Sequence, residues 1–169
     1  MTSATVELIR RGYGPRGRLG SLEQATVSAA DLEAEEHRLG FTLPPLLREL
    51  YTKVGNGGFG PDGGVLGLKG GVTDDDGRSL IDVYQWMLKA NPIDPDWKWP
   101  EKMVPLLDLG CAIKLCVDCS EPPHPVVLFD PNGHSEGIAW DAAFSVASSS
   151  FEAWIAAWLK ERGLETHES

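Results

Sequence analysis

Three cysteines and a histidine form the sequence's most distinctive pattern of reactive side chains. The cysteines follow the spacing Cys111-x₄-Cys116-x₂-Cys119, and His124 lies five residues further on. This cysteine spacing occurs around plant-type two-iron clusters, which need four cysteine ligands from a loop that surrounds the cluster. The chain has only three cysteines, and an alternating strand pattern would place Cys111 and Cys116 on opposite faces. We therefore predict no metal or cofactor site, and we interpret the cysteines as small core residues, with Cys119 in a loop.

The same residues could instead form a cysteine-dependent hydrolase, in which a histidine activates a thiol for nucleophilic attack. Cys116 or Cys119 would be the nucleophile and His124 its base, oriented by Asp118 or Asp130. No nucleophile-elbow or protease signature surrounds either cysteine. We predict that the chain has no catalytic site, and the hydrolase stays as the weaker alternative.

A triplet of carboxylates, Asp74-Asp75-Asp76, suggests a calcium loop. In the EF-hand register that places Gly77 at position 6, positions 1 and 12 are Val72 and Val83, so both essential carboxylates are missing. The triplet therefore predicts a solvated acidic loop, with a metal or a partner contact as the less favoured interpretations.

The chain as a whole is acidic, with 15 Lys and Arg residues against 25 Asp and Glu residues and a formal net charge of −10. Residues 1–20 carry +3, from four arginines and one glutamate, so the remaining residues carry −13. Such a surface repels nucleic acid and anionic membranes and accelerates the docking of a basic partner. The simplest alternative is that the acidity only keeps the protein soluble.

Length and composition predict one soluble domain. The chain has 169 residues, of which 42% are hydrophobic and 24% charged, as in ordinary globular proteins. No apolar run approaches the roughly 18 residues that cross a bilayer, and no signal peptide precedes the domain. An odd number of cysteines does not make a disulfide framework. We therefore expect a cytoplasmic protein.

We divide the chain into three parts. Residues 1–20 are rich in glycine and arginine and cannot bury enough apolar surface to fold alone. We expect them to form a basic N-terminal arm that docks against the acidic body. Residues 21–163 form the single domain, and the tail 164–169 should fray.

Two helices separated by a tight corner are predicted between residues 28 and 55. Ser28 opens the first helix, which ends at Leu39, because Gly40 can adopt the left-handed conformation that stops a helix. Pro44 suits the first turn of the second helix. After it, the run Asn56-Gly57-Gly58 tolerates the positive φ angles of a sharp turn.

Glu36 lies on the apolar stripe of the first helix, between Leu32 and Leu39. A carboxylate in such a position must find a partner or shift its pKa. We predict a structural hydrogen bond from a nearby backbone group to Glu36. For Glu36 to act as a general acid or base, it would need a second catalytic residue, and the sequence shows none.

The order of Glu36, Leu39-Gly40, Leu43-Pro44 and Asn56-Gly57-Gly58 resembles the N-terminal signature of the SUKH superfamily, named after the Smi-one/Knr-four proteins. The resemblance extends from about residue 28 to residue 159. Many bacterial members are immunity proteins of toxin systems, so the resemblance implies a non-enzymatic protein that binds and neutralises a toxin, often a nuclease. Its eukaryotic members suggest the alternative of a regulatory scaffold module without a toxin partner.

The remaining elements predict an α+β fold. We expect a twisted, mainly antiparallel sheet covered by N-terminal, inserted and C-terminal helices. The predicted strands are residues 65–68, 104–110, 111–118, 125–129 and 137–140, with a linker at 141–146. The predicted helices of the second half are residues 79–90, with Leu80, Tyr84, Met87 and Leu88 on its buried face, and a final helix that Ser149 caps and Gly163 closes.

Loops and aromatic anchors provide most contacts with protein partners. Nuclease sites are basic because they hold phosphate, and a carboxylate-rich patch can therefore occupy them. We also expect at least one tryptophan of the loop 92–100 to cover the sheet edge. The residues predicted to contact a basic toxin are Asp74, Asp75, Asp76, Asp94, Asp96 and Trp97.

Overall fold

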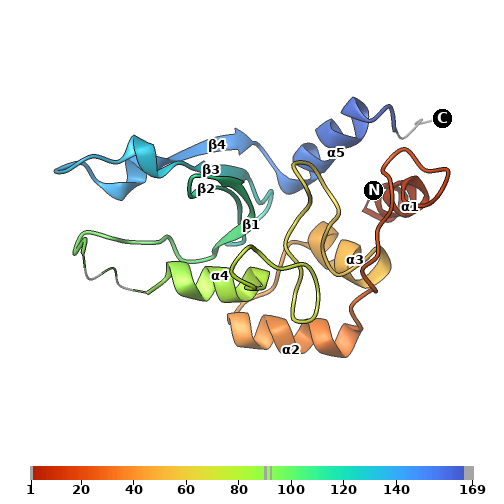
Figure 1. Ribbon diagram of the computed structural model, residues 1–169, viewed down its shortest axis with the longest axis horizontal. Coiled ribbons are helices and arrows are strands. Elements are labelled where there is room, and N and C mark those ends of the chain that lie inside the picture. Colours follow the sequence, from red (N-terminus) through yellow and green to blue (C-terminus); the bar gives the residue numbers. More distant parts are fainter. Residues whose placement is uncertain (1, 90, 92, 166–169) are drawn as a thin grey trace.

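Four consecutive strands form one antiparallel sheet in the order β1-β2-β3-β4. The computed structural model describes residues 2–89, 91 and 93–165, and Figure 1 shows their arrangement. The strands are β1 (Met103–Gly110), β2 (Ile113–Asp118), β3 (Val126–Phe129) and β4 (Phe144–Ser148). The helices are α1 (Thr2–Gly12), α2 (Ala29–Leu39), α3 (Pro45–Lys53), α4 (Leu80–Met87) and α5 (Phe151–Glu161). This is the α+β fold that the sequence predicted.

The sheet is the centre of the hydrophobic core. In β2, the consecutive residues Leu115, Cys116 and Val117 are all buried, although successive side chains of a strand point to opposite faces. The sheet is therefore covered on both faces at this point. In the view of Figure 1, the helices lie to the right of the sheet and below it, and the connection from β3 to β4 projects to the left.

The corner between α2 and α3 forms as the sequence predicted. The Ser28 side chain caps α2 by accepting the backbone N–H of Asp31, and Gly40 ends the helix with a φ of 93°. Pro44 is the N-cap of α3, and Pro45 occupies its first turn, where a missing N–H is harmless. The buried face of α3 consists of Leu46, Leu47, Leu50 and Tyr51.

A long glycine-rich loop connects α3 to α4. Position 57 requires glycine, because its φ is +87° and a Cβ there would lie 2.6 Å from the backbone nitrogen of Gly67. The predicted strand 65–68 is wrong: this segment is irregular and reaches β1 through a backbone hydrogen bond from Leu66 to Leu106 (2.8 Å). The apolar residues of 65–68 are buried by the close packing of this loop and not by a regular strand ladder.

The N-terminal segment differs from the expected arm. Residues 2–12 form α1, which packs against α3, and Val6 and Ile9 belong to the hydrophobic core. The Tyr13 hydroxyl oxygen accepts the backbone N–H of Gly60 at 3.3 Å. This segment is thus continuous with the main body. At the other end, Leu164 packs against the core, whereas residues 166–169 of the predicted tail lie outside the described residues.

The predicted positions of the last strand and its linker are wrong. Residues 137–140 form a turn and the start of a 3₁₀ helix, Trp140–Ala143, and β4 occupies residues 144–148. The register pairs Phe129 of β3 with Phe144, whose rings lie 5.1 Å apart. Phe144, rather than Trp140, is therefore the aromatic partner across the strands. The following helix is capped by Ser150 instead of Ser149.

Candidate functional site

An acidic groove of about 480 Å³ lies between the turn from β1 to β2 and the loops that precede α4. One cationic side chain, that of Arg78, is among its lining residues. The groove is therefore electronegative, which favours basic groups. The carboxylates that line it are Asp62, Asp74, Asp75, Asp76 and Asp108.

Asp74 organises the loop in front of α4. Its Oδ1 accepts the backbone N–H groups of Asp76 (3.0 Å) and Arg78 (2.8 Å), and its Oδ2 accepts Nε of Arg78 at 2.9 Å. The Asp74 side chain is only 12% exposed. Asp76 is 76% exposed and accepts a second hydrogen bond from the Arg78 guanidinium at 2.8 Å. Most of the hydrogen-bonding capacity of Asp74 is therefore used within the loop.

Asp62 and Asp75 are the carboxylates of the groove that remain available. Both are exposed, and within the described residues neither has a side-chain hydrogen bond or ion pair. Asp108 is different, because its Oδ2 accepts a hydrogen bond from Nζ of Lys114 at 2.7 Å. Burial acts to raise the Asp108 pKa, but Lys114 and the Gly110 N–H together hold this pKa below its usual value.

The rim of the groove continues onto α4 through Trp86. The Arg78 guanidinium lies 4.7 Å from the centre of the Trp86 ring, at a distance typical of cation–π contacts. Trp86 is 53% exposed. The sequence reasoning did not select it, although it stands off the stripe of Leu80, Tyr84 and Met87. Leu88, which was placed on that buried stripe, is instead the C-cap and is 43% exposed.

The second predicted contact loop is tied to the connection between β3 and β4. Asp94 accepts the backbone N–H of Asp96 (3.0 Å) and the indole N–H of Trp140 (2.9 Å). Trp97 is half-buried, with its ring 4.7 Å from that of Trp140. Its indole N–H donates to the carbonyl oxygen of Met87 at 2.9 Å. Trp97 thus packs inside an aromatic cluster. Of the three predicted contacts in this loop, Asp96 is exposed, whereas Asp94 and Trp97 are half-buried.

Trp99 belongs to the same aromatic cluster. It is 4% exposed, and its ring lies 5.0 Å from Phe129 of β3 and 5.3 Å from Phe144 of the edge strand β4. A tryptophan therefore does pack at the sheet edge as predicted. The two predicted contact loops lie before and after α4, and within the described residues no hydrogen bond or ion pair joins them. Asp74, Asp75 and Asp76 line the groove, whereas Asp94 and Asp96 are not among its lining residues.

The glutamate of the helical corner holds α2 and α3 together. Glu36 is 7% exposed, and its carboxylate accepts the backbone N–H of Leu43 at 2.6 Å and Nε of Arg48 at 3.0 Å. The first contact confirms the predicted structural hydrogen bond. Asn56 has a similar role in the glycine loop, since its side chain bonds to the N–H of Leu68 (2.7 Å) and the carbonyl of Lys69 (3.2 Å). The neighbouring motif residues shape the turn or are buried, namely Leu39, Gly40, Leu43, Pro44, Gly57 and Gly58.

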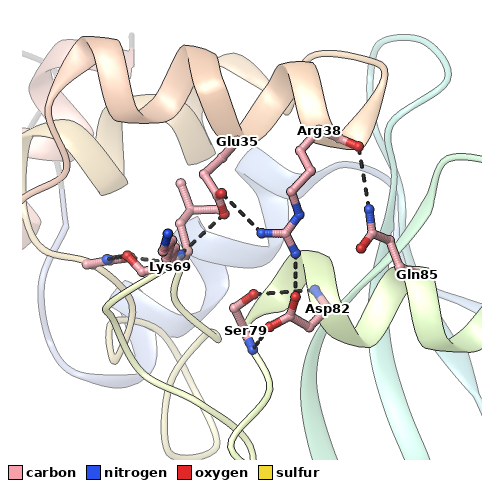
Figure 2. Close-up of polar contacts among 8 residues, drawn as sticks. Glu35, Arg38, Lys69, Ser79, Asp82 and Gln85 are labelled. Atoms are coloured by element: carbon pink, nitrogen blue, oxygen red, sulfur yellow. Dashed lines mark hydrogen bonds and ion pairs between the residues drawn. The ribbon is translucent and has the colours of Figure 1, made fainter.

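A polar network positions α4, and with it the groove, relative to α2 (Figure 2). Glu35 accepts hydrogen bonds from Arg38 (3.2 Å) and from the backbone N–H of Lys69 (3.3 Å). Arg38 also pairs with Asp82, whose other oxygen accepts the N–H of Ser79 at the start of α4. Burial acts to raise the Asp82 pKa, but the Ser79 hydrogen bonds and Arg38 outweigh it, so that the pKa is lowered.

The cysteines and His124 are not arranged as a nucleophile and its base. Cys116 and Cys119 are buried, and burial raises the pKa of both thiols far above the usual range. A ring nitrogen of His124 instead contacts the carbonyl oxygen of Asp118 at 3.0 Å. Cys111 was predicted to be a core residue, but it is exposed, because it lies in the turn before β2. In the part of the chain that the structure describes, no group of three His, Cys, Asp or Glu residues could hold a metal.

Comparison of the chain with known proteins and protein families identifies its family. No curated protein and no solved structure matches the chain, and none of the described helices is long and apolar enough to cross a membrane. The model of the SMI1/KNR4 family (SUKH-1) matches residues 26–157. The match covers more than half of the 169 residues and includes the corner, the glycine loop, α4 and the sheet. The chain therefore belongs to the SMI1/KNR4 family (SUKH-1).

Proposed function

We propose that the protein is an immunity protein that binds a basic toxin domain through its acidic groove and neutralises the toxin without catalysis. Family membership supports an immunity-protein-like domain. The observation that carries the proposal is the groove itself, in which Asp62 and Asp75 are exposed and have no partner within the described residues. These two carboxylates are free to pair with cations of another protein.

The proposed inhibition needs only binding. A nuclease toxin must hold phosphate groups, so its active site carries lysines and arginines. A groove of carboxylates can occupy that site in place of phosphate, and charge complementarity accelerates association. The deep burial of Cys116 and Cys119 also supports a non-catalytic role, because a protonated buried thiol is a poor nucleophile. That the partner is a toxin, and that the protein acts in the cytoplasm, are both parts of this proposal.

Co-expression with a toxin tests the proposal. We expect the gene beside this one to encode a large multi-domain protein, and the probe is the C-terminal domain of that protein, expressed in cells that it kills. We expect the wild-type protein to rescue growth, and the double variant Asp62→Asn/Asp75→Asn to rescue it at least about tenfold less well. The matched control is Glu33→Gln/Glu161→Gln, which removes the same charge from exposed positions outside the groove.

The results of this experiment test the immunity function and the groove as binding surface separately. If the wild-type protein gives no rescue, the immunity proposal is wrong. Full rescue by Asp62→Asn/Asp75→Asn would mean that the groove is not the toxin-binding surface. Equal loss in both double variants would mean that only the net charge of the protein matters.

A further inference from the structure

The outer face of α4 carries a large aromatic side chain next to the groove. The helix buries Leu80, Ile81, Val83, Tyr84 and Met87, whereas Trp86 is 53% exposed. A tryptophan is large and seldom so accessible on a helix whose other apolar residues are buried. A single exposed apolar side chain does not by itself mark an interface, so the ring matters here through its position beside the groove.

Arg78 makes the ring and the groove one surface. Its side chain lines the groove, bonds to Asp74 and Asp76, and covers one side of the Trp86 ring. The loop and α4 are thereby fixed to each other. The Arg38–Asp82 pair holds α4 in turn against α2 (Figure 2), so the ring is presented from a rigid element. Little conformational freedom would be lost when a partner packs on it.

We propose that Trp86 is the anchor of the partner-binding surface, and that the docking segment of the partner is a protein segment rich in arginine or lysine. This inference rests on the proposed function and extends its surface from the groove onto α4. Binding hot spots are enriched in tryptophan and lie next to polar residues that exclude water. Here Asp75 and the Arg78-bonded Asp76 provide the polar side, and an arginine of the partner could pair with the unpartnered Asp75 while its alkyl stem packs on the ring.

The charge of the groove selects this occupant. Nucleic acid carries phosphates, which the five aspartates of the groove repel. A second copy of the chain carries the same net charge of −10, which opposes self-association through this face. A basic protein segment is the occupant that satisfies both the carboxylates and the exposed ring.

Octa-arginine is the probe for this surface, because it requires no toxin. The chain has six tryptophans, whose indole N–H groups give separate NMR signals, and the Trp86 signal is identified by its loss in Trp86→Phe. We expect octa-arginine to shift the Trp86 signal in a saturable manner, while the signals of the buried Trp99 and Trp158 stay in place. Calorimetry should show roughly tenfold weaker binding for Trp86→Leu and for Asp62→Asn/Asp75→Asn.

The control Glu33→Gln/Glu161→Gln should bind octa-arginine as the wild type does. An unmoved Trp86 signal would overturn the inference. Equal weakening in both double variants would also overturn it, because it would show diffuse attraction to the whole acidic surface. The peptide result is independent of the toxin: a shifted Trp86 signal without rescue of growth refutes the immunity proposal alone, and rescue without the shift refutes the role of Trp86 alone.

Discussion

The carboxylate of Glu36 in α2 accepts the backbone N–H of Leu43, seven residues later, at 2.6 Å. This hydrogen bond closes the corner before α3, and Arg48 of α3 adds an ion pair to the same carboxylate. A buried backbone N–H without an acceptor is costly, so the geometry of the corner depends on Glu36.

Replacing Glu36 with alanine should lower the free energy of unfolding by about 2 to 3 kcal/mol, because the Leu43 N–H and Arg48 both lose their partner. Glu36→Gln should cost less, since its side-chain oxygen can still accept the Leu43 hydrogen bond. Urea denaturation measures both effects. Glu33→Ala, at an exposed position of the same helix, should change stability by at most about 0.5 kcal/mol, and an equal cost at both positions would contradict this role of Glu36.

Acid should weaken the contact between α2 and α4 through Asp82. In the folded protein, burial acts to raise the Asp82 pKa, but the hydrogen bonds from Ser79 and the charge of Arg38 hold it below its usual value. A lowered folded pKa means that the carboxylate stabilises the protein above the unfolded pKa, and that this contribution disappears as the pH falls through the folded pKa. Unfolding midpoints measured between about pH 6 and pH 2 should therefore fall less steeply for Asp82→Asn than for the wild type. If the midpoints of the two proteins fell equally steeply toward low pH, the interactions of Asp82 with Arg38 and Ser79 would contribute nothing to stability.

The three thiols should differ sharply in reactivity. Cys111 is exposed, whereas Cys116 and Cys119 are buried with raised pKa values, and the thiolate is the reactive form. A thiol-specific reagent should therefore label one cysteine rapidly in the native protein and the other two only after denaturation. Cys111→Ser should abolish the rapid phase. Rapid labelling of Cys116 or Cys119 would reopen the hydrolase alternative.

The N-terminal helix should be necessary for stability. Ile9 is fully buried, so Ile9→Ala should lower the free energy of unfolding by about 2 to 4 kcal/mol. Arg16→Ala, at an exposed position of the same predicted arm, should change it by at most about 0.5 kcal/mol. If Ile9→Ala proved neutral in urea denaturation, residues 2–12 would behave as the separable arm that their composition suggested.

Local patterns predicted the helical corner well, because Ser28, Gly40 and the prolines act through short-range capping and backbone geometry. The spacing of Val6 and Ile9 is also typical of a helix. The arm was predicted instead because the composition was taken over residues 1–20 as a whole, where the glycines and arginines of residues 10–20 dominate. The last strand was misplaced because Trp140 and Phe144 are both strand-forming aromatic residues. Only tertiary packing decides which of them pairs with Phe129.

The candidate site was harder to predict. The sequence indicated the acidic triplet, but not that Asp74 would be used by Arg78 or that Asp62 would face the same groove from an earlier loop. It also favoured Trp97, a loop tryptophan that packs against Trp140, over Trp86. A helical wheel places Trp86 off the buried stripe, and that signal could have identified it.

The affinity of the purified protein for the toxin domain that we expect the neighbouring gene to encode tests the central claim most directly. Calorimetry should show a one-to-one complex whose dissociation constant rises at least about tenfold in Asp62→Asn/Asp75→Asn and stays unchanged in Glu33→Gln/Glu161→Gln. The absence of a complex, or an equal rise in both variants, would contradict binding through the acidic groove.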